Sequence, residues 1–326
     1  MMAPRISVLM SVYDGERHLA EAIESVLGQS LGDFELIVVD DGSTDGTDHI
    51  LRSFAARDER VRVVQNESNV GLTRSLNRGL AAARGVYVAR HDADDICAPR
   101  RFELQTRFLD ARPDVALVCG AFERMDEDGR PLGRVTVPGD HDSLEATLLL
   151  MNPICHSSVM ARRDSVSRAG GYDESFAFSQ DYDLWWSIGR IGSLAALPEV
   201  VVRRRQGDAI LSRTHGEEQA KCSLRVSLRA VKDSLGGEPL DEAAFSRFWW
   251  ARRGQRHLLQ SGDIGRLGPL WDLLARHPRG PAVWGPRLRR MGLGLARRGQ
   301  VREGLALFWA GRLRAGGDRI AAGPRA

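Results

Sequence analysis

The chain has 326 residues, 43% of them hydrophobic, which is enough for one large globular domain or for one domain with a smaller companion. Its four cysteines are widely spaced and form no C-x-x-C pair, so the sequence favours neither a zinc site nor a disulfide framework. The formal net charge of +3 hides an asymmetry, because residues 1–202 carry a net −11 and residues 203–326 a net +14. This asymmetry predicts two functional regions.

The N-terminal sequence lacks a basic segment followed by a long apolar one, and no run approaches the roughly 18 apolar residues that cross a bilayer. We therefore expect a cytoplasmic protein with reduced cysteines and no signal peptide. The C-terminal region is rich in Arg and Trp, which suits peripheral contact with the inner face of the cell membrane. Solvated helix faces are the simpler interpretation of its Arg spacing, and we expect no nucleic-acid partner.

Short apolar runs alternate with helical periodicity in the first 90 residues. Strands are predicted at 6–12, 34–39, 61–64 and 86–89, and helices over the apolar positions of 19–27, 50–54 and 72–80. This β-α order with short connections predicts a mostly parallel, Rossmann-like α/β sheet flanked by helices.

The pattern becomes less regular farther along the chain. Helices are predicted at 99–111, 142–150 and 182–191, and strands at 115–119, 122–125, 158–161 and 198–204. From about residue 215 the pattern is helical. We therefore expect an α/β domain over residues 1–212 and a basic helical region over residues 213–326.

Acidic and polar side chains follow three of the predicted parallel strands. They are Tyr13-Asp14, Asp40-Asp41 and the cluster Asp92-Ala93-Asp94-Asp95. Because ligands bind beyond the carboxyl ends of parallel strands, we expect these groups to share one rim. Three carboxylates within four residues repel one another, and oxygen ligands without His or Cys suit Mg²⁺ or Mn²⁺. A solvated acidic loop is the alternative for the cluster taken alone, and the shared rim favours a metal site.

Several motifs in collinear order resemble those of family 2 glycosyltransferases, whose fold is called GT-A. They are Ser7–Asp14, Glu21–Ser30, Phe34–Asp45, Asn69–Leu72, Asn77–Leu80 and Ala83–Gly85, followed by the acidic cluster. The resemblance covers roughly residues 5–212. Neither G-x-G-x-x-G nor a P-loop motif occurs, which disfavours dinucleotide and P-loop folds.

The resemblance implies roles on the donor side. It places Ser11, Tyr13 and Asp41 beside the nucleoside, Arg74 near the pyrophosphate or base, and Asp92 at the ribose. It makes Asp94 and Asp95 the ligands of Mg²⁺ or Mn²⁺.

On the acceptor side, residues 180–185 (Gln-Asp-Tyr-Asp-Leu-Trp) resemble a family motif that usually begins with two acids. Gln180 replaces the first acid, so Asp181 remains as the match for the catalytic base. A carboxylate there would take the proton of the attacking hydroxyl. Helix capping by Asp181 is the structural alternative. His156 lies where the family lines the acceptor pocket, and a buried structural histidine is its alternative.

The family commonly has Tyr-Arg-x-His after its last core strand. Here residues 203–206 read Arg-Arg-Arg-Gln, so Gln206 stands where His is usual. Arg204 or Arg205 is then expected to clamp the diphosphate by charge.

The resemblance implies inverting transfer of a sugar from a UDP- or dTDP-type nucleotide-sugar donor. A glycan or lipid-linked hydroxyl would be the acceptor, in surface polysaccharide or glycolipid synthesis. A nucleotidyltransferase is an alternative with a similar sheet, but residues 11–17 lack its Gly- and Lys/Arg-rich phosphate loop. A catalytically weakened nucleotide-sugar-binding protein is the other alternative, because of Gln180 and Gln206.

Overall fold

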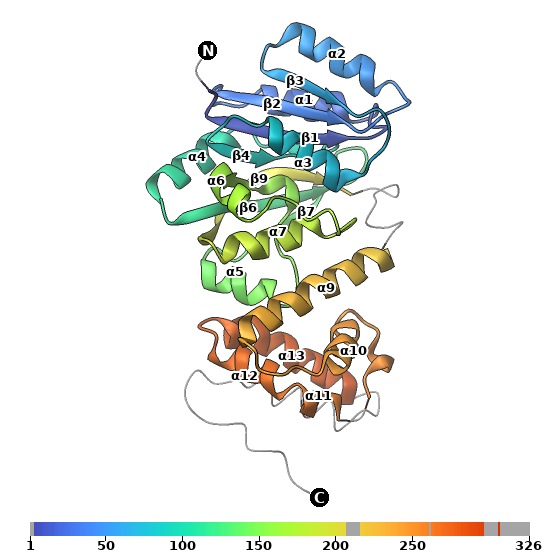
Figure 1. Ribbon diagram of the computed structural model, residues 1–326, viewed down its shortest axis with the longest axis vertical. Helices are drawn as coiled ribbons and strands as arrows, with labels where there is room; N and C mark the ends of the chain where they lie inside the picture. The colour runs from blue at the N-terminus through green and yellow to red at the C-terminus, as the bar shows by residue number, and fades with distance from the viewer. Residues whose placement is uncertain (1–2, 207–215, 261, 297–305, 307–326) are drawn as a thin grey trace, which may run out of the picture. The chain divides into compact units, whose positions relative to one another are not determined.

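The computed structural model describes residues 3–206, 216–260, 262–296 and 306 (Figure 1). The chain forms two compact units. We call residues 1–141 with 153–222 the sheet unit, and residues 142–152 with 223–326 the helical unit. The expected domain boundary at 212/213 lies outside the described residues.

The sheet unit is built on one mixed sheet. The order across it is β3 (Val61–Gln65), β2 (Phe34–Asp40), β1 (Ile6–Val12), β4 (Tyr87–Arg90), β8 (Met160–Arg162), β6 (Val115–Met125), β9 (Ser193–Arg205) and β5 (Ile96–Cys97), with β7 (Pro131–Val135) paired to β6. The four strands β3, β2, β1 and β4 are parallel, as the β-α alternation predicted. β8 is antiparallel to both of its neighbours, and β5 is antiparallel to β9, so the expectation of a mostly parallel sheet holds for only part of it.

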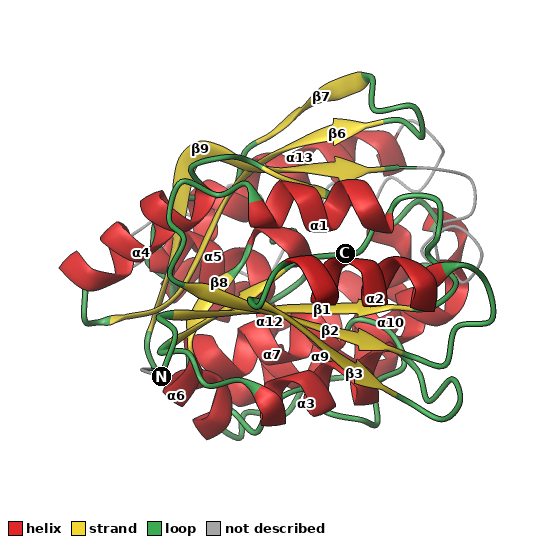
Figure 2. Ribbon diagram, turned by 90° about the horizontal axis from the view of Figure 1, so that it is seen from above, coloured by secondary structure: helices red, strands yellow, loops and turns green. Residues whose placement is uncertain are grey.

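Helices cover both faces of this sheet (Figure 2). They are α1 (Leu19–Leu27), α2 (Thr47–Arg57), α3 (Leu72–Ala82), α4 (Arg101–Ala111), α6 (Arg163–Arg168) and α7 (Gln180–Gly189), with a 3-10 turn at His156–Ser158. Alternate residues of β1, including Val8 and Met10, join the core cluster that contains Leu19 and Ile23 of α1. Leu9, of opposite parity, faces Gly79 of α3 so closely that a Cβ there would lie 2.0 Å from its Cδ1. Strands buried on both faces explain the continuous apolar runs in the sequence.

Several elements differ from the predicted ones. Strand β9 begins at Ser193, before the predicted strand at 198–204, and β5, β7 and α6 had no predicted counterpart. The strands expected at 115–119 and 122–125 form the single strand β6, whose pairing with β9 is irregular beside Gly120. A Cβ on Gly120 would lie 2.7 Å from both methyl carbons of Val201, which explains the glycine. Helix α7 begins at Gln180, directly after Ser179 in a left-handed conformation with φ of 59°. This places Asp181 in the first turn of the helix.

The helical unit is made of helices and a 3-10 turn at Arg256–Leu258. Helix α5 (His141–Leu148) belongs to it from Asp142 onward, and helix α9 (Gly216–Leu235) from Ser223 onward. Its other helices are α10 (Glu242–Arg252), α11 (Asp263–Arg266), α12 (Gly268–Arg276) and α13 (Gly280–Ala296). Trp249, Trp271 and Trp284 are at most 5% exposed and pack in its interior. The indole N–H of Trp284 donates to the carbonyl of Ala146 at 2.6 Å. These rings are therefore not available for the membrane surface that the Trp content suggested.

None of the helices within the described residues is both long enough and apolar enough to cross a membrane. The four cysteines form no disulfide with one another, and three of them are buried.

Candidate active site

The carboxyl ends of β1, β2 and β4 lie side by side on one rim of the sheet. Val12 pairs with Asp40, and the N–H of Asp41 donates to the carbonyl of Val12 at 2.8 Å. The N–H of His91 donates to the carbonyl of Leu9 at 3.0 Å, which ties the start of the acidic loop to the same strand. The parallel order of these three strands thus brings the polar residues that follow them to a common edge.

Asp41 is buried and holds the loop that precedes α3. Its carboxylate accepts the side-chain N–H of Asn66 at 2.6 Å and the backbone N–H groups of Val70 and Gly71, each at 2.9 Å. Gly71 has a φ of 92°, which favours glycine at this turn. Asp41 therefore already binds three donors of its own chain.

The other residues expected at the nucleoside are more open. Tyr13 is 50% exposed, and the neighbouring Asp14 carboxylate raises its pKa. Ser11 is partly exposed on β1. Arg74 is exposed and forms an ion pair with Glu174 at 3.3 Å. These side chains line the ends of β1 and α3 with groups that solvent can reach.

The acidic loop, residues 92–95, connects β4 to β5. Asp92 forms an ion pair with the buried Arg90, and the hydroxyl of Ser157 donates to its Oδ2 at 2.6 Å. Burial alone would raise the pKa of Asp92, but the positive charge of Arg90 and the Ser157 hydrogen bond lower it below its usual range. Asp92 is therefore a fixed, ionised carboxylate.

The next two acids lie in a different electrostatic environment. Burial, followed by the charge of Asp92, raises the pKa of Asp94 to about 6. Burial and the charges of Asp94 and Asp92 also raise the pKa of Asp95 well above its ordinary value. Oδ1 of Asp95 accepts the backbone N–H of Arg205 at 2.8 Å, whereas its buried Oδ2 has no hydrogen-bond partner among the described residues.

This arrangement fits a divalent cation. A positive ion at Asp94 and Asp95 would offset the repulsion among the three carboxylates and satisfy the unpartnered oxygen of Asp95. Across the described parts of the chain, no group of three or more acids, histidines or cysteines converges as a complete metal cage. Mg²⁺ is commonly held by one or two carboxylates, with substrate phosphates and water as its other ligands. Asp94 and Asp95 match that donor set.

Two buried residues outside the acids, Arg101 and His91, support the loop, and of these Arg101 had no signal in the sequence. Arg101, at the start of α4, donates to the carbonyls of Arg90 and Val159 at 2.8 and 2.9 Å. Burial and the nearby charge of Arg101 lower the pKa of His91 to about 3, so its ring is neutral at ordinary pH. His91 Nε2 lies 3.2 Å from the carbonyl of Asp95 and can donate to it. A signal was present in the sequence, because Arg90-His91 directly precedes the acids.

Two side chains, Arg204 and Tyr172, respond to the charges of both the acidic loop and Asp181. Burial opposes the charge of Arg204, yet Cys155, Asp95, Asp92 and Asp181 raise its pKa. Burial also raises the pKa of Tyr172, and the charges of Asp181 and Asp92 add to this effect. The candidate base Asp181 and the donor-side Asp92 therefore act on the same two side chains.

His156 lies beside this group. Its Nε2 is 2.9 Å from the hydroxyl of Tyr172, and its ring contacts Trp185 edge-on at 5.8 Å between centroids. Burial, together with the charge of Arg90, lowers its pKa to about 3, so it is a neutral side chain. These contacts agree with a structural His156, and its place in an acceptor pocket stays a prediction.

Residues 205 and 206 differ in their environments from Arg204. The Arg205 guanidinium is buried and donates to groups of its own chain, so the expectation that it clamps a diphosphate is wrong. Gln206 is partly exposed, and its backbone N–H donates to the carbonyl of Met125 at 2.8 Å, which ends the β6–β9 ladder. Arg204 remains the arginine of this strand whose pKa is raised by the charges of Asp95, Asp92 and Asp181.

A mixed α/β sheet with an acidic loop at the carboxyl end of its fourth strand is the architecture of GT-A glycosyltransferases. Solved structures support this fold. Residues 1–349 of TarS from S. aureus, in complex with UDP-GlcNAc, superpose with a TM-score of 0.60 at 17% identity, covering 94% of this chain and 91% of that chain. The mannosyltransferase PcManGT from Pyrobaculum calidifontis, in complex with GDP-Man and Mn²⁺, gives a TM-score of 0.53 at 20% identity, with coverages of 97% and 88%.

Sequence comparison identifies the family. Residues 7–170 match the domain described as glycosyl transferase family 2, and the chain belongs to that family. AmsE of Erwinia amylovora, named an amylovoran biosynthesis glycosyltransferase, is 32% identical over 226 residues, or 68% of this chain and 83% of AmsE. EpsE of Bacillus subtilis, whose name also describes a glycosyltransferase, is 39% identical over 189 residues, or 56% of this chain and 66% of EpsE.

Proposed function

We propose that this glycosyltransferase moves a sugar from a UDP- or dTDP-type nucleotide sugar to an acceptor hydroxyl, with inversion at the anomeric carbon. The observation that carries this proposal is the common rim on which the polar residues after β1, β2 and β4 lie, with Asp92 bound to Ser157, the neighbour of His156. The charges of Asp92, Asp95 and Asp181 also raise the pKa of Arg204, which supports a base near the acidic loop. The solved structures with UDP-GlcNAc and with GDP-Man support a nucleotide sugar as the class of donor.

On the donor side, the exposed Tyr13 and the partly exposed Ser11 are proposed to contact the nucleoside. Asp41 is proposed to contribute to the same pocket through the loop that it holds, and Arg74 to approach the base or pyrophosphate. Asp92, fixed by Arg90 and Ser157, is proposed to accept hydrogen bonds from the ribose. A fixed, ionised carboxylate is a strong acceptor for hydroxyl groups.

Asp94 and Asp95 are proposed to hold Mg²⁺ or Mn²⁺. When bound there, the ion would offset the negative charge that develops on the leaving diphosphate. Arg204 adds a second positive charge near the same carboxylates, and Gln206 extends from the same strand end. The Mn²⁺ in the PcManGT structure supports this metal class.

Asp181 is proposed to act as the general base. It lies in the first turn of α7, next to the buried Gln180, which has no ionisable group. Asp181 would remove the proton of the acceptor hydroxyl while that oxygen attacks the anomeric carbon on the face opposite the diphosphate. A single displacement of this kind inverts the configuration and needs no covalent intermediate. His156 and Tyr172 are proposed to line the acceptor position as neutral polar groups.

The acceptor is proposed to be a glycan or a lipid-linked sugar in surface polysaccharide or glycolipid synthesis. AmsE, which covers two thirds of this chain and is named for amylovoran biosynthesis, supports the polysaccharide class.

The helical unit is proposed to contact the inner face of the cell membrane through α13. Arg287, Arg290 and Leu293 are exposed on this helix, and Leu293 is 49% exposed. Within the described residues neither arginine has an ion-pair partner, and burial together with Arg290 lowers the pKa of Arg287. Two adjacent cations beside an exposed apolar side chain fit an anionic lipid surface.

The proposed function is tested by measuring the thermal midpoint with a panel of nucleoside diphosphates and nucleotide sugars, with Mn²⁺ or with EDTA. Ligands that bind the folded state raise the midpoint by mass action. We expect a UDP- or dTDP-linked sugar to raise the thermal midpoint in Mn²⁺, and to raise it much less in EDTA. The same nucleotide sugar should be consumed when an extract that contains glycan acceptors is added. Binding without turnover would favour the weakened binding protein, and no response to any nucleotide sugar would refute the donor assignment.

A further inference from the structure

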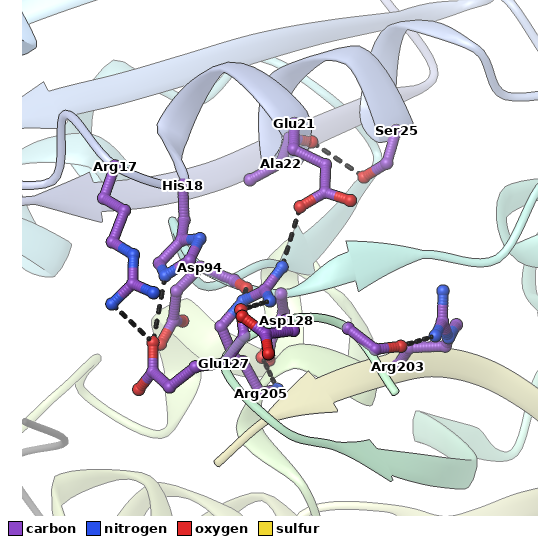
Figure 3. A network of polar contacts seen from close by, with 12 residues as sticks. Arg17, His18, Glu21, Ala22, Ser25, Asp94, Glu127, Asp128, Arg203 and Arg205 are labelled. Atoms are coloured by element: carbon purple, nitrogen blue, oxygen red, sulfur yellow. Dashed lines mark hydrogen bonds and ion pairs between the residues drawn. The ribbon is translucent and has the colours of Figure 1, made fainter. Parts of the chain in front are cut away.

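Arg205, the last residue of β9, places a buried guanidinium beneath the acidic loop (Figure 3). Its side chain is only 3% exposed. Nε donates to the carbonyl of Asp94 at 3.0 Å, one terminal nitrogen to the carbonyl of Glu127 at 2.6 Å, and the other to a carboxylate oxygen of Glu21 at 2.7 Å. One side chain therefore joins helix α1, the acidic loop and the turn between β6 and β7.

Arg205 also binds the next residue of the loop. Its backbone N–H donates to Oδ1 of Asp95 at 2.8 Å, which leaves Oδ2 as the oxygen without a partner among the described residues. The carbonyl of Asp94 and the N–H of Asp95 belong to one rigid peptide plane. Fixing that carbonyl thus holds in place the peptide that links the two acidic residues, while the Arg205 N–H holds the Asp95 carboxylate itself.

The chemistry of the guanidinium suits this position. A planar fork with five N–H donors can bind a carboxylate and several carbonyls in different directions at once, which a single ammonium group cannot do. Burying a cation is costly unless its charge and its donors are satisfied. Glu21 supplies the opposite charge, and the carbonyls of Asp94 and Glu127 supply acceptors.

We infer that Arg205 is a positioning residue that sets the affinity of the donor site for its divalent cation, by holding Asp94 and Asp95 in the orientation that binds the ion. This inference rests on the proposed donor site. Arg205 itself touches neither the donor nor the ion, because its guanidinium is occupied by groups of its own chain. Residues that orient metal ligands typically change metal affinity by about 10- to 100-fold when they are replaced.

The test compares Arg205→Met with Arg203→Met. Arg203 is a matched control on the same strand, because its guanidinium binds Glu123 at 3.0 Å and the carbonyl of Gly129 instead of the loop. Mn²⁺ binding is measured by electron paramagnetic resonance in the presence of UDP, GDP or dTDP, whichever raises the thermal midpoint of the wild type. Affinity for the same nucleotide is measured separately in EDTA.

We expect Arg205→Met to raise the apparent Kd for Mn²⁺ by about tenfold or more, and Arg203→Met to change it less than about twofold. Nucleotide affinity in EDTA should stay within about twofold in both variants. Arg205→Lys should give an intermediate Kd, because one ammonium group can replace only part of the fork. Equal Mn²⁺ affinities for the two methionine variants would overturn the inference.

Glu21 provides a second route if Arg205→Met does not fold. Glu21 is half-exposed, so Glu21→Gln should fold, and Glu24→Gln on the exposed side of the same helix is its control. Weakening the anchor of the guanidinium should raise the Kd for Mn²⁺ about threefold in the first variant and leave it unchanged in the second. An unchanged Kd in Glu21→Gln would count against the inference. A wild-type protein that binds no Mn²⁺ with any nucleotide would instead defeat the proposed metal-dependent donor site.

Discussion

Ser157 donates its hydroxyl to Asp92 at 2.6 Å, and the backbone N–H of Asp92 donates back to the same oxygen at 3.1 Å, across 65 residues of sequence. Ser157 is fully buried, whereas the carboxylate of Asp92 is partly exposed. The pair joins the 3-10 turn before β8 to the acidic loop after β4. Because both hydrogen bonds use one hydroxyl, a single substitution releases the carboxylate and the backbone of Asp92 together.

Ser157→Ala is expected to raise the KM for the donor by about 3- to 10-fold, since a freed Asp92 would bind the ribose with a less defined geometry. Stability should fall by about 1–2 kcal/mol through loss of the buried hydrogen bonds. Ser158→Ala is the control, because the Ser158 hydroxyl donates to the carbonyl of Cys155 at 2.7 Å and not to the acidic loop. Steady-state kinetics of both variants check this, and equal KM values would show that Ser157 has only a structural role.

Asp181→Asn is expected to lower kcat by about 10²- to 10⁴-fold, because an amide cannot accept the acceptor's proton. Nucleotide affinity should stay within about threefold, since a base acts mainly in the transition state. Asp173→Asn, an exposed acid before α7, should leave both quantities near wild type. Loss of nucleotide binding in Asp181→Asn would show that this residue belongs to the donor site instead.

Chelation is expected to remove activity, and added Mn²⁺ or Mg²⁺ to restore it, because Asp94 and Asp95 would otherwise repel the diphosphate. In Asp95→Asn, the amide oxygen can still accept the hydrogen bond from the backbone N–H of Arg205, but the negative charge of the side chain is lost. The variant should therefore need a higher Mn²⁺ concentration than the wild type to reach half of its maximal activity. Activity is measured against Mn²⁺ concentration after treatment with EDTA. Full activity in EDTA would rule out the metal assignment.

Glu35 provides a pH-dependent test of the fold away from the site. This carboxylate on β2 is 3% exposed and binds the Ser7 hydroxyl at 2.7 Å, Arg62 at 2.6 Å and Arg84 at 2.8 Å. Burial opposes ionisation, but the hydrogen bonds from Arg84, Ser7 and Arg62 lower its pKa to about 2. A lowered folded-state pKa gives stability that is fully present above the unfolded pKa of about 4.3 and is lost as the pH falls toward 2.

We therefore expect Glu35→Gln to lower the free energy of unfolding by about 2 kcal/mol at pH 7, after allowance for the exposure of the two arginines. The difference from wild type should shrink between pH 4.5 and pH 2. Urea denaturation at a series of pH values measures this, with the exposed Glu67→Gln as the control. A difference that does not depend on pH would show that packing, and not charge, stabilises Glu35.

Arg287→Gln with Arg290→Gln is expected to reduce binding to vesicles that contain anionic phosphatidylglycerol by at least about tenfold, because each cation near such a surface contributes about 1 kcal/mol. Arg266→Gln with Arg276→Gln is a matched control, since both of these arginines lie near acids, Asp241 at 3.9 Å and Glu238 at 3.5 Å. Co-sedimentation of the full chain checks this. Equal binding by both double variants, or no binding by the wild type, would refute contact through α13.

The local sequence predicted the first half of the sheet well, because β1 and β2 are continuous apolar runs followed by polar turns. It did not predict the direction of β8, a three-residue strand whose antiparallel pairing with β4 depends on the chain between them. Register and direction of so short a strand follow from tertiary packing and not from periodicity.

The acids of the candidate site were visible for a similar reason: they are adjacent in sequence and follow a strand. Their partners were not visible, because Ser157 lies 65 residues from Asp92 and Arg205 lies 110 residues from Asp95. Arg204 or Arg205 was expected at the diphosphate, since charge alone does not distinguish an exposed guanidinium from a buried one. Only the packing around β9 shows that the Arg205 guanidinium donates to backbone carbonyls of its own chain.

The distant origin of these partners limits how the acidic loop can be exchanged between related enzymes. Four residues are easily transplanted, but Arg90, Ser157 and Arg205 come from β4, the turn before β8 and the end of β9. A chimeric enzyme that receives residues 92–95 without these partners would have the correct acidic residues, but their side chains would not be held in the correct orientation. Attempts to alter donor or metal preference would therefore have to exchange all of these segments together, as one interdependent module.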